Sequence, residues 1–109
     1  MERVSLYHYE STEIKISIDA YFEGDTLVID GYDIGKRVEA WWGDSDYEYN
    51  VRIPKVGIDF LFRHLKVEGK SRNELLLELS RKYNSNTCYS DIRKLMSENN
   101  IDCEGFTWV

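Results

Sequence analysis

The fold of this chain is decided by the stretch Glu13-Ile14-Lys15-Ile16-Ser17-Ile18-Asp19-Ala20. Apolar and polar side chains alternate strictly along it, so in an extended chain the isoleucines share one face and the charged residues share the other. Isoleucine-rich alternation with a period of two residues is typical of a strand with one buried and one hydrated face. The stretch therefore predicts an antiparallel sheet that is covered on one side and faces water on the other.

Further segments predict strands of the same sheet. Residues 4–9 precede the first stretch, and Glu23-Gly24-Asp25 has the composition of a tight turn that leads into a strand over residues 26–30. Residues 46–53 alternate again, and residues 101–109 are expected to return as an edge strand. The two faces of the 46–53 strand would carry Tyr47, Tyr49, Val51 and Ile53 on one side and Asp46, Glu48, Asn50 and Arg52 on the other.

A loop and a short helix are expected between the third and fourth of these strands. Residues 31–35, with the sequence GYDIG, predict the loop. Apolar residues spaced at i, i+3 and i+4 predict two helical turns over residues 36–42. Gly43 stands where a helix commonly ends.

Three longer helices are expected after residue 53. Pro54 ends the strand and suits the first turn of a helix. Ser71 and Glu74 form the S-x-x-E pattern of a capping box, which predicts the start of the next helix, and residues 87–98 predict the last. The expected apolar stripes are Ile58, Leu61, Phe62 and Leu65, then Leu75, Leu76, Leu79 and Tyr83, then Cys88, Ile92, Leu95 and Met96.

Strands first and helices afterwards favour an α+β fold. We expect a single domain over residues 1–109, because a chain of this length has room for one hydrophobic core. Its antiparallel sheet should have three to five strands, mostly from the N-terminal half, with one short and three longer helices packed on one face. The order of the strands and the oligomeric state do not follow from the sequence.

The net charge of −6 is unevenly distributed. Residues 1–50 carry twelve acidic and four basic side chains, whereas residues 51–109 carry eight and ten. An acidic surface repels phosphates and attracts basic proteins, so a basic protein partner is favoured and nucleic acid is disfavoured. The basic residues that could serve a nucleic acid are spread over three expected helices and mixed with acids: Lys66, Lys70, Arg72, Arg81, Lys82, Arg93 and Lys94.

Other features bear on location. Two cysteines are too few for a disulfide scaffold. The first ten residues mix charges and tyrosines without the apolar stretch of a signal peptide, and the apolar runs are far too short for a membrane span. We expect a cytoplasmic protein with no membrane partner.

No pattern for calcium, phosphate or nucleotide binding holds. The acids within residues 44–48 have the alternate spacing of a calcium loop, but Tyr49 and Lys55 stand where such a loop needs Gly and Glu. Glycine-rich phosphate motifs and the G-x-S-x-G nucleophile motif are missing from the sequence. We expect no cofactor.

The histidines and cysteines favour structural roles. His8 falls in an expected strand, and His64 falls near a helix C-terminus, where a cationic ring is favoured by the helix dipole. Cys88 and Cys103 lack the spacing of zinc ligands, and Cys88 is in register with the apolar stripe of its helix. We therefore assign no catalytic residue and no metal ligand.

Aromatic residues beside carboxylates are the strongest indication of function. Neighbouring aromatics on one strand or helix cannot all face inward, so part of this surface should be exposed. Tyrosine and tryptophan combine a large contact area with a polar group and are favoured at protein interfaces. The predicted partner-binding residues are Trp41, Trp42, Asp44, Asp46, Tyr47, Glu48 and Tyr49, with Asp30 and Asp33 close in sequence.

Residues 27–65 resemble a family of short uncharacterised bacterial proteins. The resemblance is carried by Gly31-Tyr32-Asp33-Ile34-Gly35, by the GDSDYEY segment at residues 43–49 and by the leucine-rich helix at residues 54–65, with Phe106 and Trp108 in a similar aromatic tail. That family has no established activity, so the resemblance implies a small bacterial cytoplasmic protein. By its size and acidity the chain also looks like the immunity partners of secreted toxins.

Two functions follow from these patterns. The first is a non-enzymatic protein-binding module with an acidic, aromatic surface, for example an immunity-type protein that blocks a basic toxin. The alternative is a small enzyme or ligand-binding domain, which would need His64 or an acid in a pocket between sheet and helices.

Overall fold

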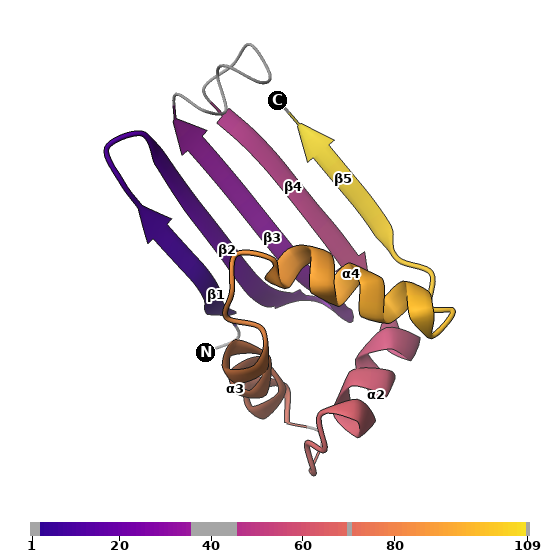
Figure 1. The fold of residues 1–109 in the computed structure, drawn as a ribbon. Helices are drawn as coiled ribbons and strands as arrows, with labels where there is room; N and C mark the ends of the chain where they lie inside the picture. Colours follow the sequence, from indigo (N-terminus) through magenta and orange to yellow (C-terminus); the bar gives the residue numbers. More distant parts are fainter. Residues whose placement is uncertain (1–2, 36–45, 70, 109) are drawn as a thin grey trace.

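The computed structural model describes residues 3–35, 46–69 and 71–108. Five strands form one antiparallel sheet in the order β1-β2-β3-β4-β5, and three helices lie between β4 and β5 in the sequence (Figure 1). The strands are β1 (Arg3–Glu10), β2 (Ile14–Glu23), β3 (Thr26–Gly35), β4 (Asp46–Ile53) and β5 (Glu104–Trp108). The helices are α2 (Lys55–His64), α3 (Arg72–Lys82) and α4 (Cys88–Glu98).

The helices lie on one side of the sheet. In Figure 1, α4 crosses in front of the strands, and α2 and α3 lie below it, while β5 returns along the outer side of β4. The expected α+β class, the antiparallel sheet and the three longer helices are therefore confirmed. The short helix predicted at residues 36–42, with Gly43 at its end, lies outside the described residues.

The strand register explains why one face of the sheet is the core. Ala20 on β2 lies opposite Ile29 on β3, and Ile29 lies opposite Val51 on β4. Directly opposed residues of an antiparallel pair share a face, and all three of these side chains have no exposed surface. The helices bury their predicted stripes against this face, chiefly with Leu61, Leu75, Leu79, Ile92 and Met96.

The helix starts follow the local sequence. Pro54 is the N-cap of α2, and the Ser71 side chain accepts a hydrogen bond from the Glu74 backbone N–H at the start of α3. That bond confirms the serine half of the predicted capping box. Cys88 begins α4 and is fully buried, as its place in the apolar stripe predicted. Among the described residues, no helix is long and apolar enough to cross a membrane.

The prediction of a loop at residues 31–35 is wrong, because these residues continue β3. Gly31 pairs with Ile18 on one side and with Tyr49 on the other. The Tyr49 ring packs directly on Gly31, so a Cβ there would lie 2.0 Å from ring atom Cε2. The glycine in this segment therefore makes room for an aromatic ring on the neighbouring strand and does not form a turn.

Candidate functional site

The side of the sheet away from the helices, called the open face here, carries the polar half of each alternating strand. Its members are found from the register, because directly opposed residues of neighbouring strands lie on the same face. They are Arg3, Ser5, His8, Glu10, Lys15, Ser17, Asp19, Tyr21, Glu23, Thr26, Val28, Asp30, Tyr32, Ile34, Glu48, Asn50, Arg52, Glu104 and Phe106. Val28 is fully buried without belonging to the helix-side core, so neighbouring open-face side chains cover it.

Three carboxylates cross the middle of the open face and are called the acidic row: Asp19 on β2, Asp30 on β3 and Glu48 on β4. Asp19 and Asp30 are directly opposed across the two strands, an arrangement that is destabilising for like charges. Burial raises the pKa of Asp30, Glu48 and Asp19 raise it further, and Arg3 lowers it. The negative charge of Asp30 is therefore disfavoured by partial burial and by its two acidic neighbours.

Basic side chains pair with the acidic residues at the margin of the open face more than with those at its centre. Arg3 pairs with Asp19 at 2.9 Å, and its guanidinium lies 4.5 Å from the centroid of the Tyr21 ring. Arg52 pairs with Glu23. Within the described part of the chain, neither Asp30 nor Glu48 forms an ion pair, so the centre of the acidic row stays negative.

Aromatic side chains accompany the acids on the open face. Phe106 on β5 is 41% exposed and lies opposite Asn50. Tyr21 and Tyr32 are half-buried. The Asn50 side-chain oxygen is buried and has no hydrogen-bond partner among the described residues. An exposed ring beside uncompensated carboxylates is the combination that a basic, partly apolar protein surface can use.

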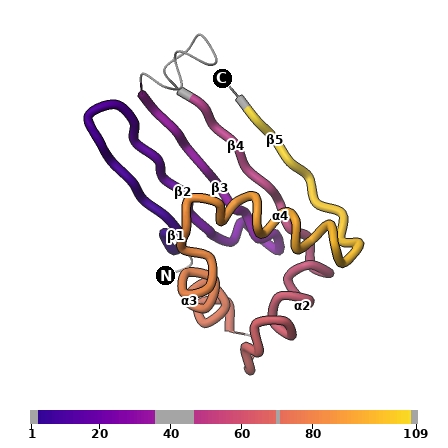
Figure 2. Tube along the Cα trace, viewed as in Figure 1, coloured from indigo at the N-terminus to yellow at the C-terminus, as the bar shows by residue number. Residues whose placement is uncertain are grey.

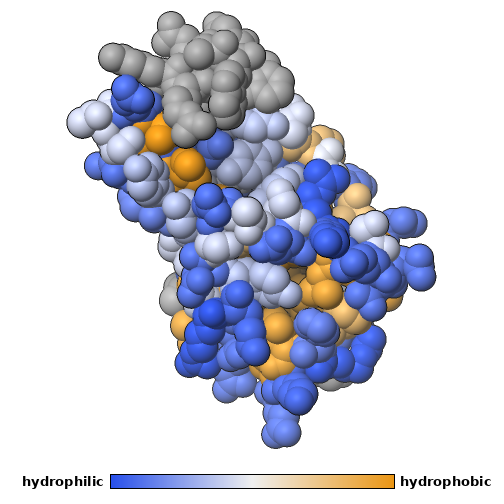
Figure 3. Space-filling model, viewed as in Figure 1, coloured by the Kyte–Doolittle hydropathy of each residue, from blue (hydrophilic) through white to orange (hydrophobic). Residues whose placement is uncertain are grey.

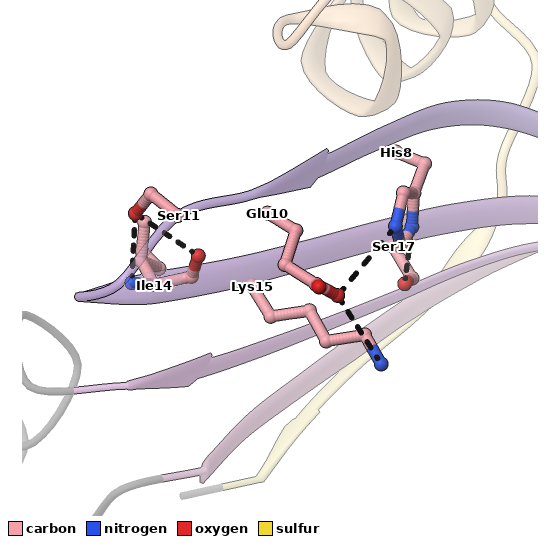
Figure 4. A network of polar contacts seen from close by, with 6 residues as sticks. All are labelled: His8, Glu10, Ser11, Ile14, Lys15 and Ser17. Carbon is pink, nitrogen blue, oxygen red and sulfur yellow. Dashed lines mark hydrogen bonds and ion pairs between the residues drawn. The ribbon is translucent and has the colours of Figure 1, made fainter.

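The β1–β2 hairpin is closed by a polar network (Figure 4). The Ser11 hydroxyl accepts a hydrogen bond of 3.1 Å from the backbone N–H of Ile14. It accepts a second one, of 3.2 Å, from the backbone N–H of Glu13. Further along, Glu10 lies 3.8 Å from the Lys15 ammonium, and His8 contacts Ser17 at 3.3 Å. His8 is exposed in this network, which indicates a structural part in the hairpin.

On the helix side of the sheet, Tyr47, Tyr49 and Tyr89 form what we call the tyrosine cluster. The Tyr49 ring centroid lies 5.3 Å from that of Tyr47 and 4.7 Å from that of Tyr89, which meets it edge-on. The Tyr49 hydroxyl donates a hydrogen bond of 3.0 Å to the Asp33 carboxylate. The cluster joins β3 and β4 to the first turn of α4.

Burial sets the protonation of the groups around this cluster. It raises the pKa of the Cys88 thiol to about 11, so this thiol is not a nucleophile at neutral pH. Burial also raises the pKa of Asp33, although the Tyr49 hydrogen bond lowers it, and raises the pKa of Tyr49. The Tyr89 hydroxyl is buried without a partner in hydrogen-bond geometry among the described residues. Burial raises the pKa of Tyr89, and Arg93 offsets part of this rise.

The structure separates the residues predicted to bind a partner. Trp41, Trp42 and Asp44 lie outside the described residues, and Asp46 is placed by its backbone opposite Ile34. Glu48 is exposed on the open face. The other two, Tyr47 and Tyr49, lie on the helix side, where Tyr49 is buried.

Sequence reasoning grouped Glu48 with these tyrosines because they are neighbours in the chain. The alternation of residues 46–53 was the signal that places them on opposite faces. The same alternation in β2 and β3 could have assigned Asp19 and Asp30 to one face. Their pairing, and the place of Phe106 beside Asn50, depended on a register that the sequence does not state.

In the described part of the chain, His64 lies away from the hollow between α4 and the sheet. His64 is exposed at the end of α2, where its ring stacks on Phe60 at 5.2 Å. A hollow between α4 and the sheet is lined by residues that include Val51, Arg93 and Cys103, without a histidine. In residues 3–35, 46–69 and 71–108, no group of three or more His, Cys, Asp or Glu could hold a metal ion.

Comparison with protein-family models, curated proteins and solved structures gave no match. The resemblance of residues 27–65 to a bacterial family therefore stays a prediction. Function has to be argued from the site itself, because a fold class alone does not specify one.

Proposed function

We propose that this protein is a non-enzymatic binding module whose open face receives a basic protein partner. The observation that carries the proposal is the acidic row next to the exposed ring of Phe106, on a sheet face that the helices leave uncovered. An immunity-type protein that blocks a basic toxin is one form of this function. A cytoplasmic location belongs to the same proposal and is supported by Cys88 and Cys103, which are free thiols.

The two kinds of residue have different tasks in this proposal. Carboxylates at the centre of the face attract a cationic partner over a distance and raise the rate of association at low salt. Once the partner is bound, aromatic rings such as Phe106 supply apolar contact area and slow dissociation. The carboxylates of Asp19 and Asp30 repel each other, and a lysine or arginine of the bound partner reduces this repulsion. The reduction contributes to the free energy of binding.

The test has two stages. Affinity capture from the native cell followed by mass spectrometry identifies a partner, and the association rate is then measured at several salt concentrations. Glu48→Lys reverses a charge in the acidic row, and Glu98→Lys makes the same change at the exposed end of α4. We expect Glu48→Lys to slow association by about tenfold at low salt and to flatten its salt dependence.

Equal slowing by Glu48→Lys and Glu98→Lys would show that only net charge matters, and the open face would then lose its role. An acidic partner would also contradict the proposal.

The alternative of a small enzyme has less support. Its best candidate is the Asp33 carboxylate, whose pKa is raised by burial. That carboxylate already accepts a hydrogen bond from the Tyr49 hydroxyl, which links β4 to β3.

A further inference from the structure

The two edges of the sheet are built differently (Figure 2). On β1, the register shifts between Ser5 and Tyr7, and Leu6 at this bulge is buried in the core. Helix α3 also packs against β1. Bulges and covering helices are devices by which proteins prevent edge strands from pairing with other chains.

As far as the described residues go, the β5 edge lacks these devices. Its register with β4 runs without a shift from Glu48 opposite Trp108 to Arg52 opposite Glu104. Residues 104–107 are all exposed, and they contain neither lysine nor proline. Beyond β5 there is no further strand in the described part of the chain (Figure 2), so the outer backbone N–H and C=O groups of β5 can accept another strand.

The surroundings of β5 are charged with opposite sign on its two sides. On the open face, Glu104 is followed by Phe106, and Glu48 lies on the neighbouring strand. On the helix side, the Arg93 guanidinium lies against Gly105, with Nη2 3.1 Å from the position that a Cβ would occupy. A strand added at this edge would therefore meet acids on one side and a cation on the other.

We propose that an extended segment of a basic partner pairs with the outer edge of β5 as a sixth strand and directs lysine or arginine side chains at alternate positions onto the open face. Side chains of a strand alternate between faces, so basic residues are favoured at every second position only, and neutral or acidic residues are favoured between them, next to Arg93. The inference rests on the proposed function and adds how the partner binds.

A second copy of the same chain fits this edge less well. Each chain has a net charge of −6, and two β5 edges would bring two sets of the same acids, Glu48 and Glu104, to one interface. A partner with basic side chains removes this repulsion, whereas a second copy adds to it.

The probe is a displayed library of random short peptides, selected on the whole protein at low salt. We expect enrichment of lysine or arginine at alternate positions. A selected peptide, once synthesised, should slow hydrogen exchange of alternate backbone amides within β5 by at least about tenfold, because amides that pointed to solvent become hydrogen-bonded. Amides of β1 at the other edge should keep their rates.

Two proline variants locate the contact. Phe106→Pro and Thr107→Pro remove neighbouring N–H groups, of which one bonds to β4 and the other points outward. The variant that keeps its thermal stability has lost the outward donor, and we expect it to bind the peptide at least about tenfold more weakly. Phe106→Ala keeps the amide and separates the loss of the ring from the loss of the backbone bond.

The outcomes separate this inference from the proposed function. In one outcome, basic peptides shift NMR signals around Asp30 and Glu48 without slowing hydrogen exchange in β5, and bind the variant that lost the outward N–H as well as the parent protein. That result overturns the added strand and leaves binding to the open face in place. Selected peptides without basic residues overturn both. Sedimentation of the protein alone shows whether it forms a dimer. A dimer that is lost in the variant without the outward N–H means that a second copy of the chain, and not a basic partner, pairs with β5.

Discussion

The two faces of one sheet place neighbouring residues in opposite environments. Ile29 points to the helices and is fully buried, whereas Asp30, the next residue on β3, lies on the open face opposite Asp19 and Asn50. The apolar side chains of the helix-side face are buried, which stabilises the fold through the hydrophobic effect. The open face contains the directly opposed carboxylates Asp19 and Asp30, which folding does not require; under the proposed function they attract a basic partner.

The largest loss of stability is expected from a substitution that leaves a cavity in the core on the helix side of the sheet. Ile29→Ala removes a side chain with no exposed surface at the centre of the core, and should lower the free energy of unfolding by about 2–4 kcal/mol. Urea denaturation measures this value. Leu77→Ala on α3, where the side chain is 44% exposed, is the control and should change stability much less.

The next effect concerns Gly31 and the ring that packs on it. Gly31→Ala places a methyl group where the Tyr49 ring lies, so we expect a loss of about 1–3 kcal/mol in unfolding free energy. In a Tyr49→Leu background the same substitution should cost less, because the ring is gone. Equal costs in both backgrounds, measured by denaturation, would mean that the close packing of Gly31 and Tyr49 is not what excludes a side chain.

A smaller effect of opposite sign is expected on the open face. The folded protein holds the Asp30 proton more tightly than the unfolded chain does, because its pKa is raised, so ionised Asp30 lowers stability at neutral pH. Asp30→Asn should therefore raise the free energy of unfolding at pH 7 by up to about 1 kcal/mol. The gain should shrink as the pH falls through the raised pKa and vanish below the ordinary carboxyl pKa.

Denaturation of both proteins across this pH range measures the difference. A gain that is the same at acidic and neutral pH would contradict the pKa argument. The substitution should also slow association with a basic partner. Asp30 would then lower the stability of the free protein and favour binding of the partner.

The smallest effect is expected at the hairpin in Figure 4. Lys15 and Glu10 form an exposed cross-strand pair at 3.8 Å. Lys15→Gln should change the free energy of unfolding by about 0.3 kcal/mol or less, since water screens such pairs. A loss comparable to that of Ile29→Ala in the same denaturation assay would mean that the open face holds the fold together, contrary to the comparison of the two faces.

The surface over the helices is mostly hydrophilic. Figure 3 views the side that carries the helices and shows mostly hydrophilic residues with apolar areas between them. The apolar stripes of α2, α3 and α4 are buried in the core beneath this surface. The acidic row lies on the opposite face of the sheet.

Local patterns in the sequence determined the elements. Strict alternation gave β2 and β4, the S-x-x-E pattern placed the start of α3, and the apolar stripes identified the core positions of the helices. These signals are local, since they depend on the preference of a few neighbouring residues for one backbone geometry. They fail at residues 31–35, where the partner of a glycine is a ring on another strand.

The sequence by itself therefore determined that this chain forms a sheet with one apolar and one polar side and three longer helices to cover the first. Only the tertiary structure decided which residues from different strands meet. Asp19 lies opposite Asp30, the Tyr49 hydroxyl bonds Asp33, and β5 is the last strand of the sheet among the described residues because of strand order and register. Those depend on contacts between residues far apart in the chain, which no local periodicity encodes.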